Sequence, residues 1–125
     1  MVGTSSQRIV KSLVFMAGET PIVVLASGPN RVDTAKLGSI FGAVVRRAQA
    51  DQVRAATGFA IGGVPPVGHA RPLRTYIDAD LLQYDQVWAA AGTPNAVFPI
   101  APDALVRITR GQVVDLKQDP APTNS

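Results

Sequence analysis

A loop rich in glycine and proline is the segment whose residue types most suggest chemistry. Residues 59–72 hold three glycines and three prolines, in the run Gly62-Gly63-Val64-Pro65-Pro66-Val67-Gly68 and at Pro72. Proline fixes the backbone φ angle, whereas glycine lets a ligand approach closely and leaves an N–H group free to face it. Such amides can stabilise a carbonyl oxygen as it becomes an oxyanion. A tight structural crossover is the alternative that this composition leaves open.

The spacing of Gly63 and Gly68 also matches the G-x-x-x-x-G portion of a Walker A phosphate-binding motif. That motif requires lysine and then serine or threonine after the second glycine, and a strand before the first. Here His69-Ala70 follows, and a helix is predicted before the loop. The loop is therefore a poor candidate for nucleotide hydrolysis.

Lys11 is the second residue that could do chemistry, because it interrupts the apolar run from Ile9 to Phe15. Side chains alternate between the two faces of a strand, so Lys11 shares a face with Ile9 and Leu13. A lysine in this position can extend its ammonium group to solvent or hold a ligand. The strand pattern leaves both roles open.

The residue types needed for familiar catalytic sets are scarce. The chain has no cysteine and one histidine, His69, which excludes thiolate nucleophiles, disulfides and cysteine or histidine metal clusters. A lone loop histidine more often makes a surface or hydrogen-bonding contact than a catalytic one. No Ser-His-Asp triad can be assigned, because five aspartates fit roles as helix caps or turn residues. These are Asp33, Asp78, Asp80, Asp85 and Asp103. We expect neither a metal nor a cofactor.

Charge and hydropathy bound the class of protein. The formal net charge of +3 tolerates a polyanionic partner without indicating one. Arg46-Arg47 is the only paired basic cluster and aromatic residues make up 6% of the chain, which argues against a general nucleic-acid-binding protein. No apolar stretch approaches the roughly 18 residues of a membrane span, and residues 1–7 do not resemble a signal peptide. We expect a cytoplasmic protein without membrane association.

The elements that position these residues are mostly strands. Two β-branched runs, Ile9–Ala17 and Pro21–Ala26, flank Gly18-Glu19-Thr20 and predict a hairpin. Further strands are predicted over residues 43–46, 74–78, 86–90, 96–100 and 112–116. Helices are predicted over residues 33–41, 49–57, the second without a good N-cap, and 102–109, with a helical link over 79–84.

Several predicted strands follow one another without an intervening helix. This order favours an α+β fold, a single domain with a mixed, curled, barrel-like sheet and flanking helices. The domain is predicted to span residues 1–125. Its core covers about residues 8–116, and the polar, proline-rich tail over 117–125 is expected to be flexible.

Blocks of sequence along residues 8–116 combine into a recognisable order. They read Val10-Lys11-Ser12-Leu13-Val14-Phe15, Arg31-Val32-Asp33, Thr57-Gly58-Phe59, Gly62-Gly63-Val64-Pro65-Pro66, Tyr76-Ile77-Asp78, Gln83-Tyr84-Asp85-Gln86-Val87-Trp88, Ala91-Gly92-Thr93-Pro94-Asn95 and Pro102-Asp103-Ala104-Leu105. This order resembles the YbaK/ProX-like aminoacyl-tRNA deacylases, which are related to the editing domain of prolyl-tRNA synthetase. The resemblance implies the same fold.

The resemblance also implies a reaction, the hydrolysis of the ester bond of misacylated tRNA without a metal or a protein nucleophile. It implies that Lys11 lines the pocket and that the G-x-x-x-P element from Gly62 to Pro66 presents backbone groups to the ester. It further implies that water attacks the carbonyl, helped by a hydroxyl of the terminal ribose and by backbone groups. We accordingly predict catalytic roles for Lys11, Gly62 and Gly63. Substrate contacts are predicted for Pro65, Pro66, Gly68, His69, Gly92 and Asn95.

The edited amino acid stays open. The cysteinyl-editing type has a serine where this chain reads Ala89-Ala90-Ala91-Gly92, and the alanine-editing type has a histidine-proline and asparagine signature near Gly92-Thr93-Pro94-Asn95. Family members usually carry a further N-terminal segment that walls the pocket, whereas few residues precede Gln7 in this sequence. A non-catalytic module that binds tRNA or aminoacyl-adenosine is therefore the alternative function. The predicted partners are the acceptor end of misacylated tRNA and prolyl-tRNA synthetase or another synthetase.

Overall fold

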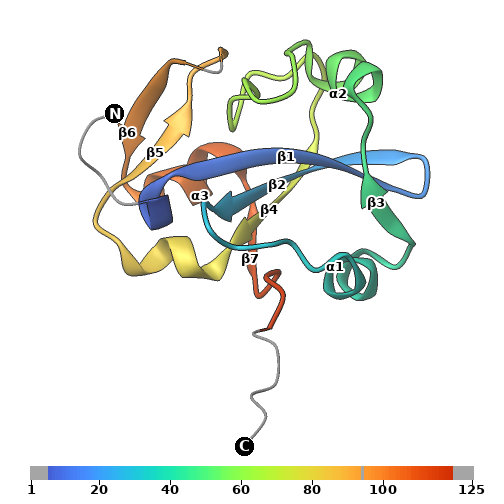
Figure 1. The fold of residues 1–125 in the computed structure, drawn as a ribbon, viewed down its shortest axis with the longest axis horizontal. Coiled ribbons are helices and arrows are strands. Elements are labelled where there is room, and N and C mark those ends of the chain that lie inside the picture. The colour runs from blue at the N-terminus through green and yellow to red at the C-terminus, as the bar shows by residue number, and fades with distance from the viewer. Residues whose placement is uncertain (1–5, 94, 120–125) are drawn as a thin grey trace, which may run out of the picture.

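A five-stranded mixed sheet forms the centre of the molecule, in the order β3-β1-β2-β4-β7 (Figure 1). The structure, a computed structural model, describes residues 6–93 and 95–119. β1 is antiparallel to both of its neighbours, whereas β2 with β4 and β4 with β7 are parallel. The strands are β1 (Val10–Ala17), β2 (Thr20–Ser27), β3 (Val45–Arg47), β4 (Arg74–Asp78) and β7 (Gln112–Val114).

The predicted hairpin is confirmed. β1 pairs with β2 along its whole length, from Val10 opposite Ser27 to Ala17 opposite Thr20. Gly18 in the turn has a φ of 60°, a conformation that glycine adopts without steric cost. β2 is buried from its second residue to its last, as expected for a strand with a partner on each edge.

Two further strands form a separate ribbon. β5 (Val87–Ala90) and β6 (Val97–Ile100) pair with each other, and β5 meets the central sheet at one isolated parallel bridge between Ile9 and Trp88. The mixed α+β domain is therefore confirmed, but the described strands do not close. The barrel-like curl that the order of the predicted strands favoured is not confirmed.

Helix ends follow local capping rules. Asp33 accepts hydrogen bonds from the N–H groups of Ala35 and Lys36 at 2.9 and 3.1 Å and starts α1 (Thr34–Phe41). Gly42 ends it with a φ of 93°. For α2 (Ala50–Thr57), a good cap was not evident from the sequence. The Gln52 side chain supplies it by accepting from the Gln49 N–H at 2.8 Å.

The remaining elements cover the sheet. α3 (Pro102–Thr109) and 3₁₀ turns over Ser6–Arg8 and Ala79–Gln83 complete the described part. α1 and β3 lie toward one end of β1, and the β5–β6 ribbon lies toward the other (Figure 1). No helix in the ranges that the structure describes has the length and apolar character needed to cross a membrane.

Buried side chains lie on both faces of β1, with odd-numbered residues on one face and even-numbered residues on the other. Odd-numbered Phe15 and Ala17 pack with the α1 residue Leu37, whereas even-numbered Val14 and Met16 pack with the α2 residue Val53. The sheet is thus the middle layer between two apolar layers.

The tail was expected to be flexible from Lys117 onward, and the structure gives the first two of its residues long-range contacts. Lys117 forms an antiparallel bridge with Val32, and the N–H of Gln118 donates to the carbonyl of Arg31 at 2.8 Å. Local composition could not reveal these long-range contacts. Residues 120–125 lie outside the described residues.

Candidate active site

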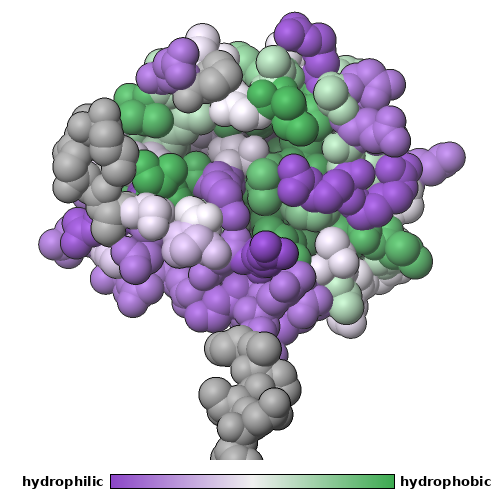
Figure 2. Space-filling view, in the orientation of Figure 1, coloured by the Kyte–Doolittle hydropathy of each residue, from purple (hydrophilic) through white to green (hydrophobic). Residues whose placement is uncertain are grey.

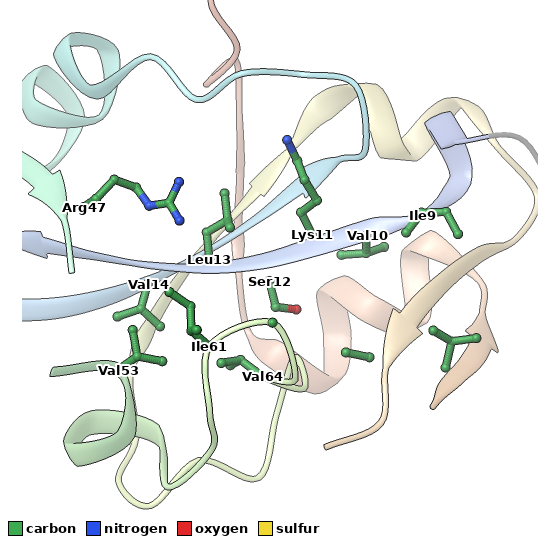
Figure 3. A pocket seen from close by; sticks show the side chains of 13 residues that line it. Ile9, Val10, Lys11, Ser12, Leu13, Val14, Arg47, Val53, Ile61 and Val64 are labelled. Atoms are coloured by element: carbon green, nitrogen blue, oxygen red, sulfur yellow. The ribbon is translucent and has the colours of Figure 1, made fainter. Parts of the chain in front are cut away.

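A cavity of about 240 Å³ opens beside the middle of β1. The strand forms its floor, α2 and the glycine-rich loop form one wall, and the β5–β6 ribbon forms the other (Figure 3). On this face of the molecule, apolar side chains flank the hollow while hydrophilic side chains cover the lower half (Figure 2). Its lining comprises Ile9, Val10, Lys11, Ser12, Leu13, Val14, Arg47, Val53, Ile61, Gly62, Val64, Ala90 and Val97.

The cavity exists because β1 changes partners along the edge that faces away from β2. β5 meets the edge at Ile9, and β3 pairs with it only from Phe15 to Ala17. Between these points, no strand in the described ranges pairs with it. An edge of this kind presents unpaired main-chain N–H and C=O groups.

The direction of these groups follows from the pairing pattern. The Val14 carbonyl accepts from the Ala48 N–H at 3.1 Å, so Val14 directs its main-chain groups toward the β3 edge. Main-chain groups alternate between the two edges of an antiparallel strand. The N–H and C=O of Ser12 therefore face the unpaired edge and are available to a ligand.

The side chain of Ser12 is the most unusual polar group in the cavity. Its Oγ is buried and has no hydrogen-bond partner among the described residues. Figure 3 shows Ser12 directed toward the loop that carries Ile61 and Val64. A buried hydroxyl without a partner is costly in a stable fold, so it favours a role in binding a polar group. Sequence reasoning missed Ser12, although a serine between Val10 and Val14 on an apolar face was a usable signal.

Lys11 lies on the opposite face of β1 from Ser12, as its alternation with Leu13 predicted (Figure 3). Its Nζ donates to the Asn30 carbonyl at 2.6 Å, so the side chain does not extend freely into solvent. Burial lowers the pKa of Lys11 below the ordinary value, and the Arg47 charge lowers it further, while Asp78 acts in the opposite direction.

A polar network holds the segment to which Lys11 binds. The Asn30 side-chain amide donates to carboxylate oxygens of both Asp78 and Asp80, at 2.8 and 2.9 Å. Asp78 is 1% exposed and also accepts from the Ser27 N–H at 3.0 Å. Lys117 donates to Asp80 at 2.7 Å. The aspartates predicted as cap or turn residues thus also fix the anchor of Lys11.

Of the two adjacent glycines predicted as catalytic, Gly62 lines the cavity. It has a φ of 87°, and a Cβ built on it would meet no atom within 4 Å. The Gly63 N–H already donates to the Ala60 carbonyl at 3.0 Å, and Gly63 is not among the lining residues. The Gly62 amide is therefore the better candidate to face a substrate carbonyl.

The second half of the loop belongs to a different surface. Pro66, Gly68 and His69 line a separate groove, and His69 Nε2 donates to the buried Pro65 carbonyl oxygen at 2.7 Å. This contact matches the hydrogen-bonding role that was the more common expectation for a lone loop histidine.

The two site residues predicted in the ribbon do not line the cavity either. Gly92 follows β5, has a φ of 100°, and lies against Phe59, because a Cβ added to it would be 3.4 Å from that ring. Asn95 is exposed, and Pro94 of the same block lies outside the described residues. Of the predicted site residues, the structure thus brings together Lys11 and Gly62.

Arg47 is a cavity residue that the sequence showed only as part of a basic pair. It lines the cavity, and its guanidinium carbon lies 5.5 Å from the centre of the Phe15 ring. Within residues 6–93 and 95–119, no group of three or more histidine, cysteine, aspartate or glutamate side chains could hold a metal ion. The cavity therefore offers main-chain groups, one hydroxyl and two basic side chains as its polar chemistry.

Comparison with known proteins gives a consistent result. Residues 1–108 match the family model described as the aminoacyl-tRNA editing domain. YwhH of Bacillus subtilis (strain 168), an uncharacterised protein, is 32% identical over 120 residues, which cover 94% of this chain and 76% of YwhH. EbsC of Enterococcus faecalis (strain ATCC 700802 / V583), a candidate Cys-tRNA(Pro)/Cys-tRNA(Cys) deacylase, is 29% identical over 92% of this chain and 71% of EbsC.

A longer relative and a solved structure give the same family relationship. The proline–tRNA ligase of Ligilactobacillus salivarius (strain UCC118) is 33% identical over 81 residues, or 64% of this chain and 14% of the ligase. A crystal structure of a candidate trans-editing enzyme for prolyl-tRNA synthetase superposes with a TM-score of 0.91 at 50% identity, covering 94% of this chain and 75% of that one.

Proposed function

Because the chain belongs to the aminoacyl-tRNA editing domain family, we propose that it hydrolyses the ester bond of a tRNA misacylated with a small, uncharged amino acid. The observation that carries this proposal is the cavity itself. It joins Lys11, the Gly62 loop and an unpaired stretch of strand edge at Ser12. Such main-chain groups suit an aminoacyl ester, which needs donors for its carbonyl and an acceptor for its ammonium group.

The proposed reaction uses water as the nucleophile. The water oxygen attacks the ester carbonyl carbon, and the free hydroxyl of the terminal ribose accepts a proton from this water while it passes its own proton to the esterified ribose oxygen. The Gly62 N–H donates to the carbonyl oxygen as it becomes an oxyanion. The bond from the carbonyl carbon to the ribose oxygen then breaks, and the ribose oxygen leaves as a hydroxyl with the proton it has received. The products are a free amino acid and uncharged tRNA.

Lys11 would position the substrate rather than transfer a proton. Its ammonium group is anchored to the Asn30 carbonyl, and the remaining two of its three donors stay available for a polar atom of the terminal nucleotide. A charged donor that is already fixed contributes more to the free energy of binding than a freely moving one, because less side-chain entropy is lost when the substrate binds.

The size and polarity of the cavity favour a substrate whose amino acid has a small side chain. A volume of about 240 Å³ must hold the amino acid and part of the ribose, and ligand pockets for larger molecules start at about 300 Å³. Val14, Val53, Ile61 and Val64 form apolar walls, and the lining contains no carboxylate. Its two basic side chains, Lys11 and Arg47, lie on the other side of β1 from these walls (Figure 3).

Metal independence is part of the proposal, because the chemistry described uses only main-chain groups, a lysine and the substrate's own hydroxyl. Deacylation is therefore expected to persist after exhaustive treatment with a chelator. Loss of turnover with the chelator, and its return on adding zinc, would contradict this mechanism.

The experiment that tests the function is a panel of tRNAs, each charged with a different amino acid, incubated with the protein. Release of free amino acid identifies the substrate. Binding of tRNA or aminoacyl-adenosine without release would instead support the alternative function, a binding module of the same fold.

A further inference from the structure

The second half of the glycine-rich loop lines a groove that the proposed reaction does not use. The groove has a volume of about 800 Å³ and lies where the loop meets the start of β4 and the end of α3. Its lining comprises Thr20, Phe41, Pro66, Val67, Gly68, His69, Ala70, Arg71, Pro72, Leu73, Arg74, Thr75, Thr109 and Arg110.

The groove is basic. Arg71, Arg74 and Arg110 are exposed in it, and its lining includes no aspartate or glutamate. Within residues 6–93 and 95–119, none of these three arginines is within 4.0 Å of a carboxylate, whereas Arg107 on the same helix as Thr109 is paired with Asp103. A quarter of the basic side chains of a chain with a net charge of only +3 are therefore gathered here without counter-ions.

One of the three arginines has its side chain held in place. The Arg74 guanidinium carbon lies 5.4 Å from the centre of the Phe41 ring, a cation–π arrangement that leaves its donors free for another group. A guanidinium held in this way suits phosphate oxygens, which it can bind through two parallel hydrogen bonds.

The groove and the cavity are connected by one short segment. Gly62 and Val64 line the cavity, and the groove begins two residues later at Pro66. Pro65 and Pro66 are buried, so the segment that joins the two surfaces is rigid. The same rigid loop therefore contributes to both surfaces.

We propose that this groove binds the phosphate backbone of tRNA, at phosphates beyond the 3′-terminal nucleotide. The identification of the polyanion as tRNA rests on the proposed function, whereas the anionic character of the ligand rests on the groove alone. The contacts are to the backbone, so they position the tRNA without reading its sequence. The hydroxyls of Thr20, Thr75 and Thr109 add neutral donors to the same surface.

Binding of bulk uncharged tRNA, measured by fluorescence anisotropy between 50 and 200 mM salt, tests the proposal without any need for catalysis. Each arginine that contacts a phosphate adds about 1 to the slope of log affinity against log salt. The triple variant Arg71→Gln, Arg74→Gln, Arg110→Gln is expected to lose about 2 to 3 from this slope. Arg71→Gln alone, on an exposed loop residue, is expected to lose about 1 and guards against misfolding of the triple variant.

Arg107→Gln is the matched control, because it removes the same charge from an arginine outside the groove. Its slope is expected to equal that of the unmodified protein. A full slope in the triple variant and in Arg71→Gln, or an equal loss in Arg107→Gln, would overturn the proposal. Binding of a labelled acidic peptide that the triple variant loses, with tRNA binding unchanged, would show a protein partner and would overturn it as well.

Deacylation assays separate this proposal from the proposed function. With full-length misacylated tRNA, the triple variant is expected to lose at least about tenfold in kcat/KM, through KM. The loss should shrink when the same ester is carried on a CCA trinucleotide, which is too short to reach the groove. If the unmodified protein releases no amino acid from either substrate, the proposed function fails while the tRNA-binding result still decides the groove.

Discussion

Replacing Ser12 with alanine is expected to change stability and activity in opposite directions. The buried Ser12 Oγ has no hydrogen-bond partner among the described residues, and such a hydroxyl costs about 1–3 kcal/mol. Alanine removes that cost and leaves a gap the size of one oxygen atom. We therefore expect Ser12→Ala to stabilise the free protein by about 1 kcal/mol.

The same substitution is expected to weaken the reaction. A hydrogen bond from Ser12 to the bound aminoacyl group contributes about 0.5–1.5 kcal/mol, which corresponds to about a 2- to 12-fold decrease in kcat/KM on its loss. Urea unfolding measures the first effect, and deacylation of the misacylated tRNA measures the second.

Ser27 provides the matched control for this experiment. Its Oγ is partnered, because it donates to the Gln7 carbonyl at 2.7 Å, and the residue is 2% exposed. Ser27→Ala should therefore destabilise the protein by about 1 kcal/mol, opposite in sign to Ser12→Ala. The reasoning is refuted if Ser12→Ala destabilises the protein as much as Ser27→Ala does, or if it leaves kcat/KM unchanged.

Three further predictions follow from the site. Lys11→Ala should lower deacylation at least about tenfold, or about 1.4 kcal/mol, while the protein stays folded; equal activity would mean that the ammonium does not contact substrate. Gly62→Ala should lower kcat about 100- to 1000-fold, and it should also lower Tm because a Cβ is strained at a φ of 87°. His69→Ala should lower kcat less than about tenfold. A larger loss of kcat in His69→Ala than in Gly62→Ala would favour His69 as a general base. The pKa of Asp80 is lowered from 3.8, first by the hydrogen bond from Lys117, so its stabilising effect is present above that pH and is lost as pH falls through the lower folded value. Asp80→Asn should therefore be less stable than the unmodified protein at pH 7, and urea unfolding should show this difference shrinking below pH 3.8.

Local patterns predicted the elements well because each depends on few neighbouring residues. The β1–β2 hairpin followed from β-branched runs around Gly18, and the limits of α1 followed from Asp33 and Gly42. The end of α3 shows the limit of such rules, since Arg110 takes the left-handed position although Gly111 is the next residue. Propensity alone does not predict a non-glycine residue there.

The site was harder to predict because it depends on pairing between distant strands. Alternation correctly placed Lys11 with Leu13, but the cavity is made where β1 lacks a partner, and that gap depends on where β3 and β5 meet it. The same limitation hid the buried hydroxyl of Ser12, which has no hydrogen-bond partner among the described residues. It also merged the two halves of the glycine-rich loop into one predicted site, whereas Gly62 and His69 line different surfaces.

The central claim is most directly tested by the rate at which the purified protein releases amino acid from tRNA charged with cysteine, alanine or proline. The account predicts release at least about tenfold above the buffer rate for a misacylated tRNA with a small side chain, and no such excess with Lys11→Ala. Release at the buffer rate from every charged tRNA in the panel would contradict it.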